Sequence, residues 1–232
     1  MDIHKPKPWH GVREFLKEYL IIVVGVLTAL GAESVVNNLH EHRLSEEAKG
    51  VVRDEMNVDI TAYARRFEVE SCVTRRMTEI EALLDAAEAG QQFTPPARIG
   101  GPREPGIYTN RWEAATAGGR TSLLSSEEQR QFGRVYQNLE HLELRQQEEY
   151  QAWLTLHALV GRRHLSAGMI DEQRLALSRA RDAEVAIRRA FEGAKFTAQQ
   201  LGVKGDAHLA SFRAPPGPSE VCQPLNGPPQ PS

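Results

Sequence analysis

Residues 19–32, YLIIVVGVLTALGA, form the longest stretch of the chain without a charged residue. Fourteen residues at the rise of an α-helix reach about 21 Å, which is less than the ~30 Å thickness of a hydrocarbon core. A helix over residues 15–36 reaches about 33 Å, and the side chains of Lys17, Glu18 and Glu33 near its ends can extend toward the headgroups. This stretch therefore predicts one transmembrane helix over residues 15–36.

The flanking residues predict the orientation of this helix. Trp9 and Tyr19 stand where interfacial aromatic residues are common. The basic residues before the apolar run outnumber those between it and Gly50; they are Lys5, Lys7, Arg13 and Lys17 against Arg43 and Lys49. Because cytoplasmic flanks carry the excess of lysine and arginine, residues 1–14 are expected in the cytoplasm and the rest of the chain outside it.

Two alternatives to an anchor remain open. A cleavable signal peptide also has a basic start, an apolar centre and small residues, which Ala29, Gly31 and Ala32 provide. A run of this length also occurs in the buried helix of a soluble protein. The charged helical pattern that begins directly after Ala32 favours the retained anchor.

Composition favours an all-α protein. The chain has 232 residues, of which 41% are hydrophobic, 6% aromatic and 25% charged, and its net charge is −3. Aromatic residues are few and long stretches are rich in alanine, glutamate, arginine, leucine and glutamine, which favour helix and argue against an all-β fold. The small net charge gives no basic field of the kind that binds nucleic acid.

Apolar spacing predicts an antiparallel bundle of long helices over residues 37–213. Residues 34–89 contain no proline and repeat apolar residues every three or four positions, with a change of phase between Phe67 and Val73 that predicts a bend. Prolines and glycines indicate a loop over residues 91–106, and a short helix is expected over residues 110–117. Ser125 and Glu128 form a capping box that begins a helix to about residue 161.

A last helix, with Asp171 as its N-cap and an alanine-rich face, is expected to end near residue 201. Residues 214–232 contain seven of the thirteen prolines and are predicted to be an extended or disordered tail. The only cysteines, Cys72 and Cys222, either pair in an oxidising compartment or remain separate thiols. Their spacing does not match a CxxC redox motif.

Two segments resemble a known group of proteins. They are residues 14–30, EFLKEYLIIVVGVLTAL, and residues 111–136, RWEAATAGGRTSLLSSEEQRQFGRVY. They are similar to bacterial single-pass membrane proteins of unknown function, which have an N-terminal anchor of the form IIVxGVL and a helical extracytoplasmic region. The resemblance implies the bacterial inner membrane, with a cytoplasmic N-terminus and a periplasmic bundle. It implies no catalytic residue.

No sequence motif for catalysis, a cofactor or a metal is present. The histidines lack a third ligand at conventional spacing. Adjacent like charges are interpreted as solvated helix surface; they include Arg65/Arg66, Arg75/Arg76 and Glu148/Glu149. The best candidate contact site combines aromatic surface and positive charge beside two glycines, in Tyr108, Arg111, Trp112 and Arg120. It could receive a small anion or an acidic partner segment, but the favoured interpretation is that Trp112 closes the bundle end while the arginines stay in solvent.

These observations predict a non-enzymatic scaffold or protein-interaction module that is anchored in a lipid bilayer. Its partner would be a second copy, met through the long helix after the anchor, or another membrane protein. The alternative is a periplasmic bundle that binds a small ligand, like a sensor. Such a sensor would act through a partner membrane protein, because about eighteen residues before the anchor are too few for a signalling domain. An enzyme is the least favoured of the three hypotheses, because no convergent acid, base and nucleophile set is visible.

Overall fold

The computed structural model describes residues 11–205 and 219–226, and these residues contain helices and no strand. The helices are α1 (Val12–Phe67), α2 (Glu70–Glu88), α3 (Asn110–Ala117), α4 (Ser126–Leu156) and α5 (Ala167–Gln200). Short 3-10 turns follow at η1 (Arg120–Leu123), η2 (His157–Leu159) and η3 (Glu220–Cys222). The prediction of an all-α fold is confirmed. The chain divides into two units, Met1–Glu47 and Ala48–Ser232, so that α1 contributes to both.

In the first unit, the apolar stretch of α1 has no cover from other described residues. An 18-residue stretch of α1 has a mean hydropathy of 2.1, and none of it is buried. Within the stretch, the hydroxyl of Thr28 donates to the carbonyl oxygen of Val24 at 2.7 Å, so this polar group is satisfied inside the helix. By length and composition, α1 could cross a membrane.

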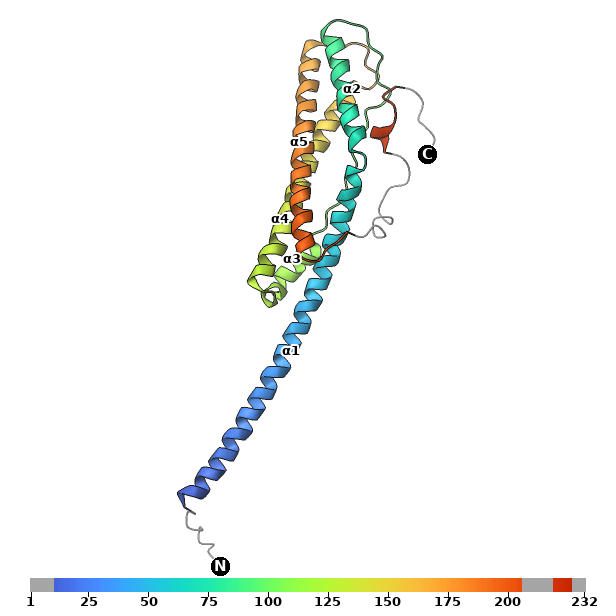
Figure 1. The fold of residues 1–232 in the computed structure, drawn as a ribbon. Coiled ribbons are helices and arrows are strands. Elements are labelled where there is room, and N and C mark those ends of the chain that lie inside the picture. Colours follow the sequence, from blue (N-terminus) through green and yellow to red (C-terminus); the bar gives the residue numbers. More distant parts are fainter. Residues whose placement is uncertain (1–10, 206–218, 227–232) are drawn as a thin grey trace, which may run out of the picture. The chain divides into compact units, whose positions relative to one another are not determined.

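In the second unit, α4 and α5 lie side by side and run antiparallel, with α2 along α5 (Figure 1). The part of α1 after Ala48 adds its apolar side chains to the same core; they are Val52, Met56, Ile60 and Tyr63. The expected antiparallel bundle of long helices is therefore present. The capping box that begins α4 is also confirmed, because the backbone N–H of Glu128 donates to Ser125 Oγ and Glu128 accepts from the backbone N–H of Ser125.

The change of phase in the apolar pattern corresponds to a break between two helices. Helix α1 ends at Phe67 and α2 begins at Glu70, with a turn between them. Before the break the apolar residues pack in a cluster with the first half of α4, and after it they pack in a second cluster with Trp153 and Leu156. The pattern shifts because α1 packs in one apolar cluster and α2 packs in the other.

The predicted N-cap of the last helix is wrong. Helix α5 begins at Ala167, and Ser166 caps it by accepting from the backbone N–H of Met169 at 3.3 Å. Asp171 lies inside the helix and is exposed. Ser166 has extended backbone geometry and directly precedes the helix, which is the conformation that an N-cap requires.

Part of the predicted disordered tail is ordered. Residues 219–226 pack on the second unit, where Val221 is 0% exposed and Cys222 is bonded to Cys72, with 4.9 Å between the Cα atoms. The backbone N–H of Ala97 donates to the carbonyl oxygen of Leu225 at 3.0 Å. Burial, a covalent link and backbone pairing together outweigh the missing donor of Pro224. The other tail residues, 214–218 and 227–232, lie outside the described residues.

Arg76 of α2 is the central contact of this segment. Its side chain is 0% exposed and donates to the carbonyl oxygens of Ile99 and Gln223 and to the carboxylate of Glu79. The two carbonyls belong to segments that are far apart in the sequence. One buried guanidinium therefore joins α2, the loop before α3 and the C-terminal segment.

Gly100 allows the loop and the C-terminal segment to touch. Its φ is +64°, and a Cβ atom there would lie 2.7 Å from the backbone nitrogen of Val221. Gly90 has a similar φ of +67°, but its Cβ position has no neighbour within 4 Å. A side chain at Gly90 therefore adds only the cost of a left-handed backbone, whereas a side chain at Gly100 adds this cost and a clash with the backbone of Val221.

We expect Gly100→Ala to lower the free energy of unfolding more than Gly90→Ala does. Both variants place alanine at positive φ, at about 1–2 kcal/mol, and only the first also pushes against the backbone of residues 220 and 221, for about 1–3 kcal/mol more. Urea unfolding of both variants measures the difference. A free-thiol assay should find unpaired cysteine in the Gly100 variant alone. Equal unfolding curves would show that the contact between the two segments is loose.

Candidate functional site

The first turn of α3 is held by an acidic side chain of α1. Glu55 is buried, and its carboxylate accepts from the backbone N–H groups of Arg111 at 2.8 Å and Trp112 at 3.3 Å. One turn later, Asp59 accepts from the backbone N–H of Tyr108 at 3.2 Å. A carboxylate at this place satisfies backbone donors that a helix start leaves unpaired and interacts favourably with the helix dipole.

Trp112 is partly buried and packs against the core of the second unit. Its ring stacks on Tyr136 with 5.1 Å between centroids and lies 6.1 Å from the ring of Phe132. The hydroxyl of Tyr136 donates to Glu55 at 2.7 Å. Burial is the main cause that raises the pKa of Tyr136, and its hydrogen bond to Glu55 adds to the effect. Glu55 therefore joins an aromatic stack to the start of α3.

The two arginines of the predicted contact site point to different surroundings. Arg111 is exposed, and its guanidinium donates to the carbonyl oxygen of Val51 at 3.3 Å. Arg120 is exposed on η1 and lines a shallow hollow with Trp112, Lys49 and Val52, which has no room for a water molecule. The backbone N–H groups of Tyr108, Arg111 and Trp112 thus all bind carboxylates of α1, whereas Arg120 shares a hollow only with Trp112 among these residues.

This geometry supports the interpretation that the region closes the bundle. The backbone donors at the start of α3, which an external anion would need, are already bound to Glu55. Sequence analysis missed Glu55 and Asp59. The available signal was their position, because both lie on the stripe of α1 that carries Met56, Ile60 and Tyr63.

A second group of buried charges lies in the middle of the bundle. The guanidinium of Arg66 on α1 binds Glu149 of α4 at 2.5 Å and Glu184 of α5 at 2.9 Å. The side chains of Arg66 and Glu149 are 2% and 1% exposed. Interpreting Arg65/Arg66, Arg75/Arg76 and Glu148/Glu149 as solvated pairs was therefore wrong for one member of each, since Arg66, Arg76 and Glu149 are buried.

Neighbouring groups extend this cluster on every side. The hydroxyl of Tyr63 donates to the side-chain oxygen of Gln146, one turn before Glu149. Arg188 of α5 pairs with Glu70 of α2, lies 3.9 Å from Glu184 and stacks over the ring of Phe67 at 4.7 Å. The cluster thus joins the end of α1, the start of α2 and the middles of α4 and α5.

Burial dominates the acid–base behaviour of Glu149. It raises the pKa of this carboxyl to about 7, against the lowering effect of Arg66 and with a further raising contribution from Glu184. Arg66 has a raised pKa, because its two carboxylate partners outweigh the burial that acts in the opposite direction. Burial also raises the pKa of Glu104 in the loop before α3, on which Arg66 acts in the opposite sense.

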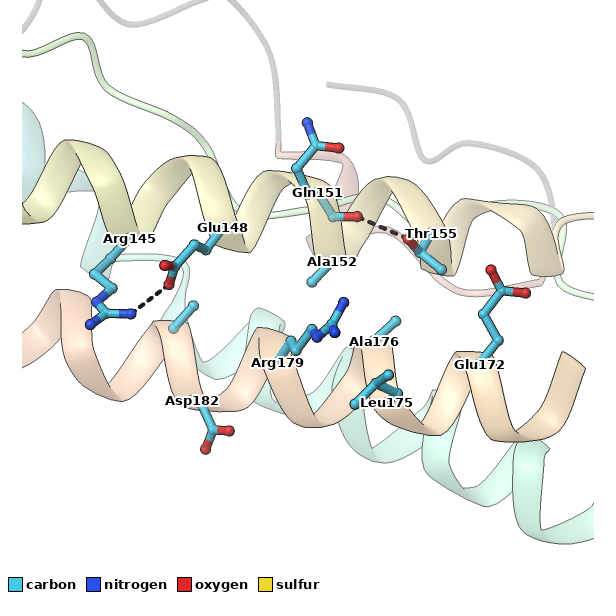
Figure 2. Close-up of a pocket in the computed structure, with 11 residues that line it drawn as sticks. Arg145, Glu148, Gln151, Ala152, Thr155, Glu172, Leu175, Ala176, Arg179 and Asp182 are labelled. Atoms are coloured by element: carbon cyan, nitrogen blue, oxygen red, sulfur yellow. Dashed lines mark hydrogen bonds and ion pairs between the residues drawn. The ribbon is translucent and has the colours of Figure 1, made fainter. Parts of the chain in front are cut away.

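A groove of about 820 Å³ runs between α4 and α5 (Figure 2). Small side chains line it where the helices approach, including Ala152 and Ala176. Charged side chains of both signs surround them; they are Arg145, Glu148, Glu172, Arg179 and Asp182. Arg145 and Glu148 pair with each other at 2.6 Å. The mixed charges give the groove no strong preference for an anion or a cation.

Among the residues that the structure describes, no group of three or more histidine, cysteine, aspartate or glutamate side chains is placed to hold a metal ion. The two cysteines are both in the disulfide. The charged clusters instead contain arginine, which takes the place that a cation would occupy between carboxylates.

Comparison of the chain with protein-family models, with curated proteins and with solved structures finds no match.

We expect Glu55→Ala to lower the free energy of unfolding by about 2–4 kcal/mol, because it leaves the buried Tyr136 hydroxyl and two partly buried backbone N–H groups without an acceptor. Glu55→Gln keeps one acceptor oxygen and should lose about half as much. Urea unfolding followed by tryptophan fluorescence gives these values.

Asp54→Ala is the matched control, because Asp54 is the exposed neighbour of Glu55 on α1. It should change the free energy of unfolding by less than about 0.5 kcal/mol. If Glu55→Ala behaved like this control, the hydrogen bonds to α3 would contribute nothing to stability.

Proposed function

We propose that the chain is a non-enzymatic scaffold or protein-interaction module, anchored in the bacterial inner membrane by residues 15–36. Its bundle would lie on the extracytoplasmic side. The observation that carries this proposal is the bare apolar surface of α1. Ten large apolar side chains between residues 15 and 30 are each more than half exposed; they are Phe15, Leu16, Tyr19, Leu20, Ile21, Ile22, Val24, Val26, Leu27 and Leu30.

Leaving such a surface in water is costly. At about 1.5 kcal/mol for each side chain, removal of these ten from water is worth roughly 15 kcal/mol, which is the scale of the whole stability of a domain. A bilayer provides the apolar surroundings without further protein. The small residues Ala29, Gly31 and Ala32 lie inside an unbroken helix, which supports an anchor over a signal peptide with a cleavage site there.

The disulfide supports the proposed side of the membrane. Cys72 and Cys222 both follow the apolar stretch, and disulfides persist in oxidising compartments such as the bacterial periplasm. The excess of basic residues before the stretch favours the same orientation. The resemblance of the anchor and of residues 111–136 to bacterial single-pass membrane proteins is consistent with it.

The buried polar groups support a structural role for the bundle. Arg66, Arg76 and Glu55 each bind groups from two or more separate segments of the chain. Their hydrogen bonds hold helices and loops in register. A scaffold needs a rigid body of this kind, and a conformationally fixed surface to present to its partner.

The partner we propose is a second copy of the chain. Beyond the apolar run, the first unit still exposes Val35, Val36 and Leu39 at 58%, 64% and 66%. Val36 and Leu39 continue a spacing of four and three residues that begins at Gly25 and passes through Ala29 and Ala32. Such spacing places one seam along a helix pair, with small residues that allow close approach.

We expect Leu27→Arg to release the protein from the membrane. One arginine at the centre of a short apolar run costs about 2.5–3.5 kcal/mol on insertion. Fractionation with alkaline carbonate washing measures the share that stays with the membrane. Leu144→Arg is the control, because Leu144 is exposed on α4 outside the apolar run and should leave the share unchanged. Recovery of the intact wild-type chain in the soluble fraction would contradict the proposal.

We expect Leu39→Cys to form a disulfide-linked dimer in membranes after mild oxidation. The two native cysteines are already bonded, so the new thiol has no intramolecular competitor. Glu41→Cys is the control, because it lies about 200° around the helix from Leu39. Non-reducing electrophoresis separates the two outcomes. Equal cross-linking at both positions, or a monomer mass in mild detergent, would argue against self-association through this seam.

A further inference from the structure

The cluster around Arg66 contains more buried negative charge than positive charge. One guanidinium lies between the carboxylates of Glu149 and Glu184, both of which it binds. Arg188, the second cation, is partly exposed, pairs with Glu70 and lies 3.9 Å from Glu184, so it offsets the charge of Glu184 only in part. If both carboxylates were ionised, the buried centre would carry an uncompensated charge, which is costly away from water.

Two carboxylate oxygens are buried without an identified donor. They are Glu149 Oε1 and Glu184 Oε1, and neither accepts a hydrogen bond from the residues that the structure describes. A proton on Glu149 removes this deficit, because the protonated carboxyl can hydrogen bond to Glu184. The same proton reduces the charge of the centre so that Arg66 balances one carboxylate.

We propose that Glu149 carries a proton in the closed bundle and donates it to a hydrogen bond with Glu184, and that loss of this proton separates α4 from α5 at these two residues. The cluster is then a pH-sensitive conformational switch. The proton leaves Glu149 for solvent, and the carboxylate that remains is repelled by Glu184. Water that enters between the helices solvates the new charge.

Charged and titratable groups face Glu149 from each neighbouring element. Tyr63 and Arg66 come from α1 and Glu184 from α5, while Glu104 of the loop before α3 interacts with Arg66. Glu70 of α2 and Arg188 of α5 form the outer pair. Burial keeps the pKa of Tyr63 above its usual value, and Arg66 keeps its charge throughout. Glu149 is the member whose raised pKa of about 7 places its titration in the neutral range.

The sign of the effect follows from this assignment. The folded state binds a proton that an ordinary glutamate in the unfolded state releases near pH 4.5. The contribution of this proton to the free energy of unfolding is therefore fully present below pH 4.5 and is lost as the pH rises through 7. This direction is opposite to that of a carboxylate stabilised in its ionised form by a salt bridge.

The test uses the full chain in detergent micelles. The wild-type unfolding temperature, relative to that of Glu149→Gln, should fall by about 5–10 °C between pH 5 and pH 8.5. The amide of glutamine keeps a donor toward Glu184 and cannot ionise. Glu184→Gln should also remove the dependence and replaces the first variant if that one does not fold. Glu148→Gln, at an exposed neighbour, should follow the wild type.

Two further measurements separate a switch from a merely structural cluster. Infrared difference spectra of the wild type should lose the band of a protonated carboxyl as the pH rises, and Glu149→Gln should lack this band. Spin labels at Gln147→Cys on α4 and Val185→Cys on α5, both exposed, should move apart with rising pH in the wild-type background but not with Glu149→Gln. Parallel melting curves, or release of the proton without a change in the label distance, would overturn the inference. Neither result would bear on the membrane anchor.

Discussion

The buried pairing of Arg66 with Glu149 and Glu184 sets the register of the whole bundle. It lies at the level where the apolar core divides into two clusters. On α4 the clusters are separated between Leu142 and Ala152, and on α5 between Ala180 and Ile187. A slide of either helix by one turn would leave a carboxylate in the core without its guanidinium. The break between α1 and α2 falls at the same level, so the charge cluster and the turn share one layer of the structure.

A connecting segment covers each apolar cluster, and a charged side chain of a long helix forms hydrogen bonds to the backbone of that segment. At one cluster, Glu55 accepts from the N–H groups at the start of α3. At the other, Arg76 donates to carbonyl oxygens of the loop and of the C-terminal segment. Loops that pack on a core must satisfy their own polar backbone groups, and these side chains do so where no regular helix or sheet pairing is possible.

Sequence patterns predicted the helices well and their polar contacts poorly. Apolar spacing, the Ser125 capping box and the proline-rich loop are local signals, and the helices follow them closely. Apart from Glu79, which lies three residues after Arg76, the partners of Glu55, Arg66 and Arg76 are 23 to 147 residues away in the sequence, so local spacing could not identify them. Interpreting adjacent charges as solvated pairs treated both members alike, although neighbours on a helix point about 100° apart and one can be buried while the other is not.

The C-terminal segment joins the folding of the bundle to its proposed compartment. Prolines alone predict an extended tail, and residues 219–226 instead pack through Val221 and the bond between Cys72 and Cys222. That bond closes a separation of 150 residues, and such links contribute about 2–5 kcal/mol. In a reducing cytoplasm the segment would rely on Arg76, the burial of Val221 and a few hydrogen bonds, against the entropy of ordering it. Under the proposed orientation, the covalent link would form only after the second unit reaches an oxidising compartment.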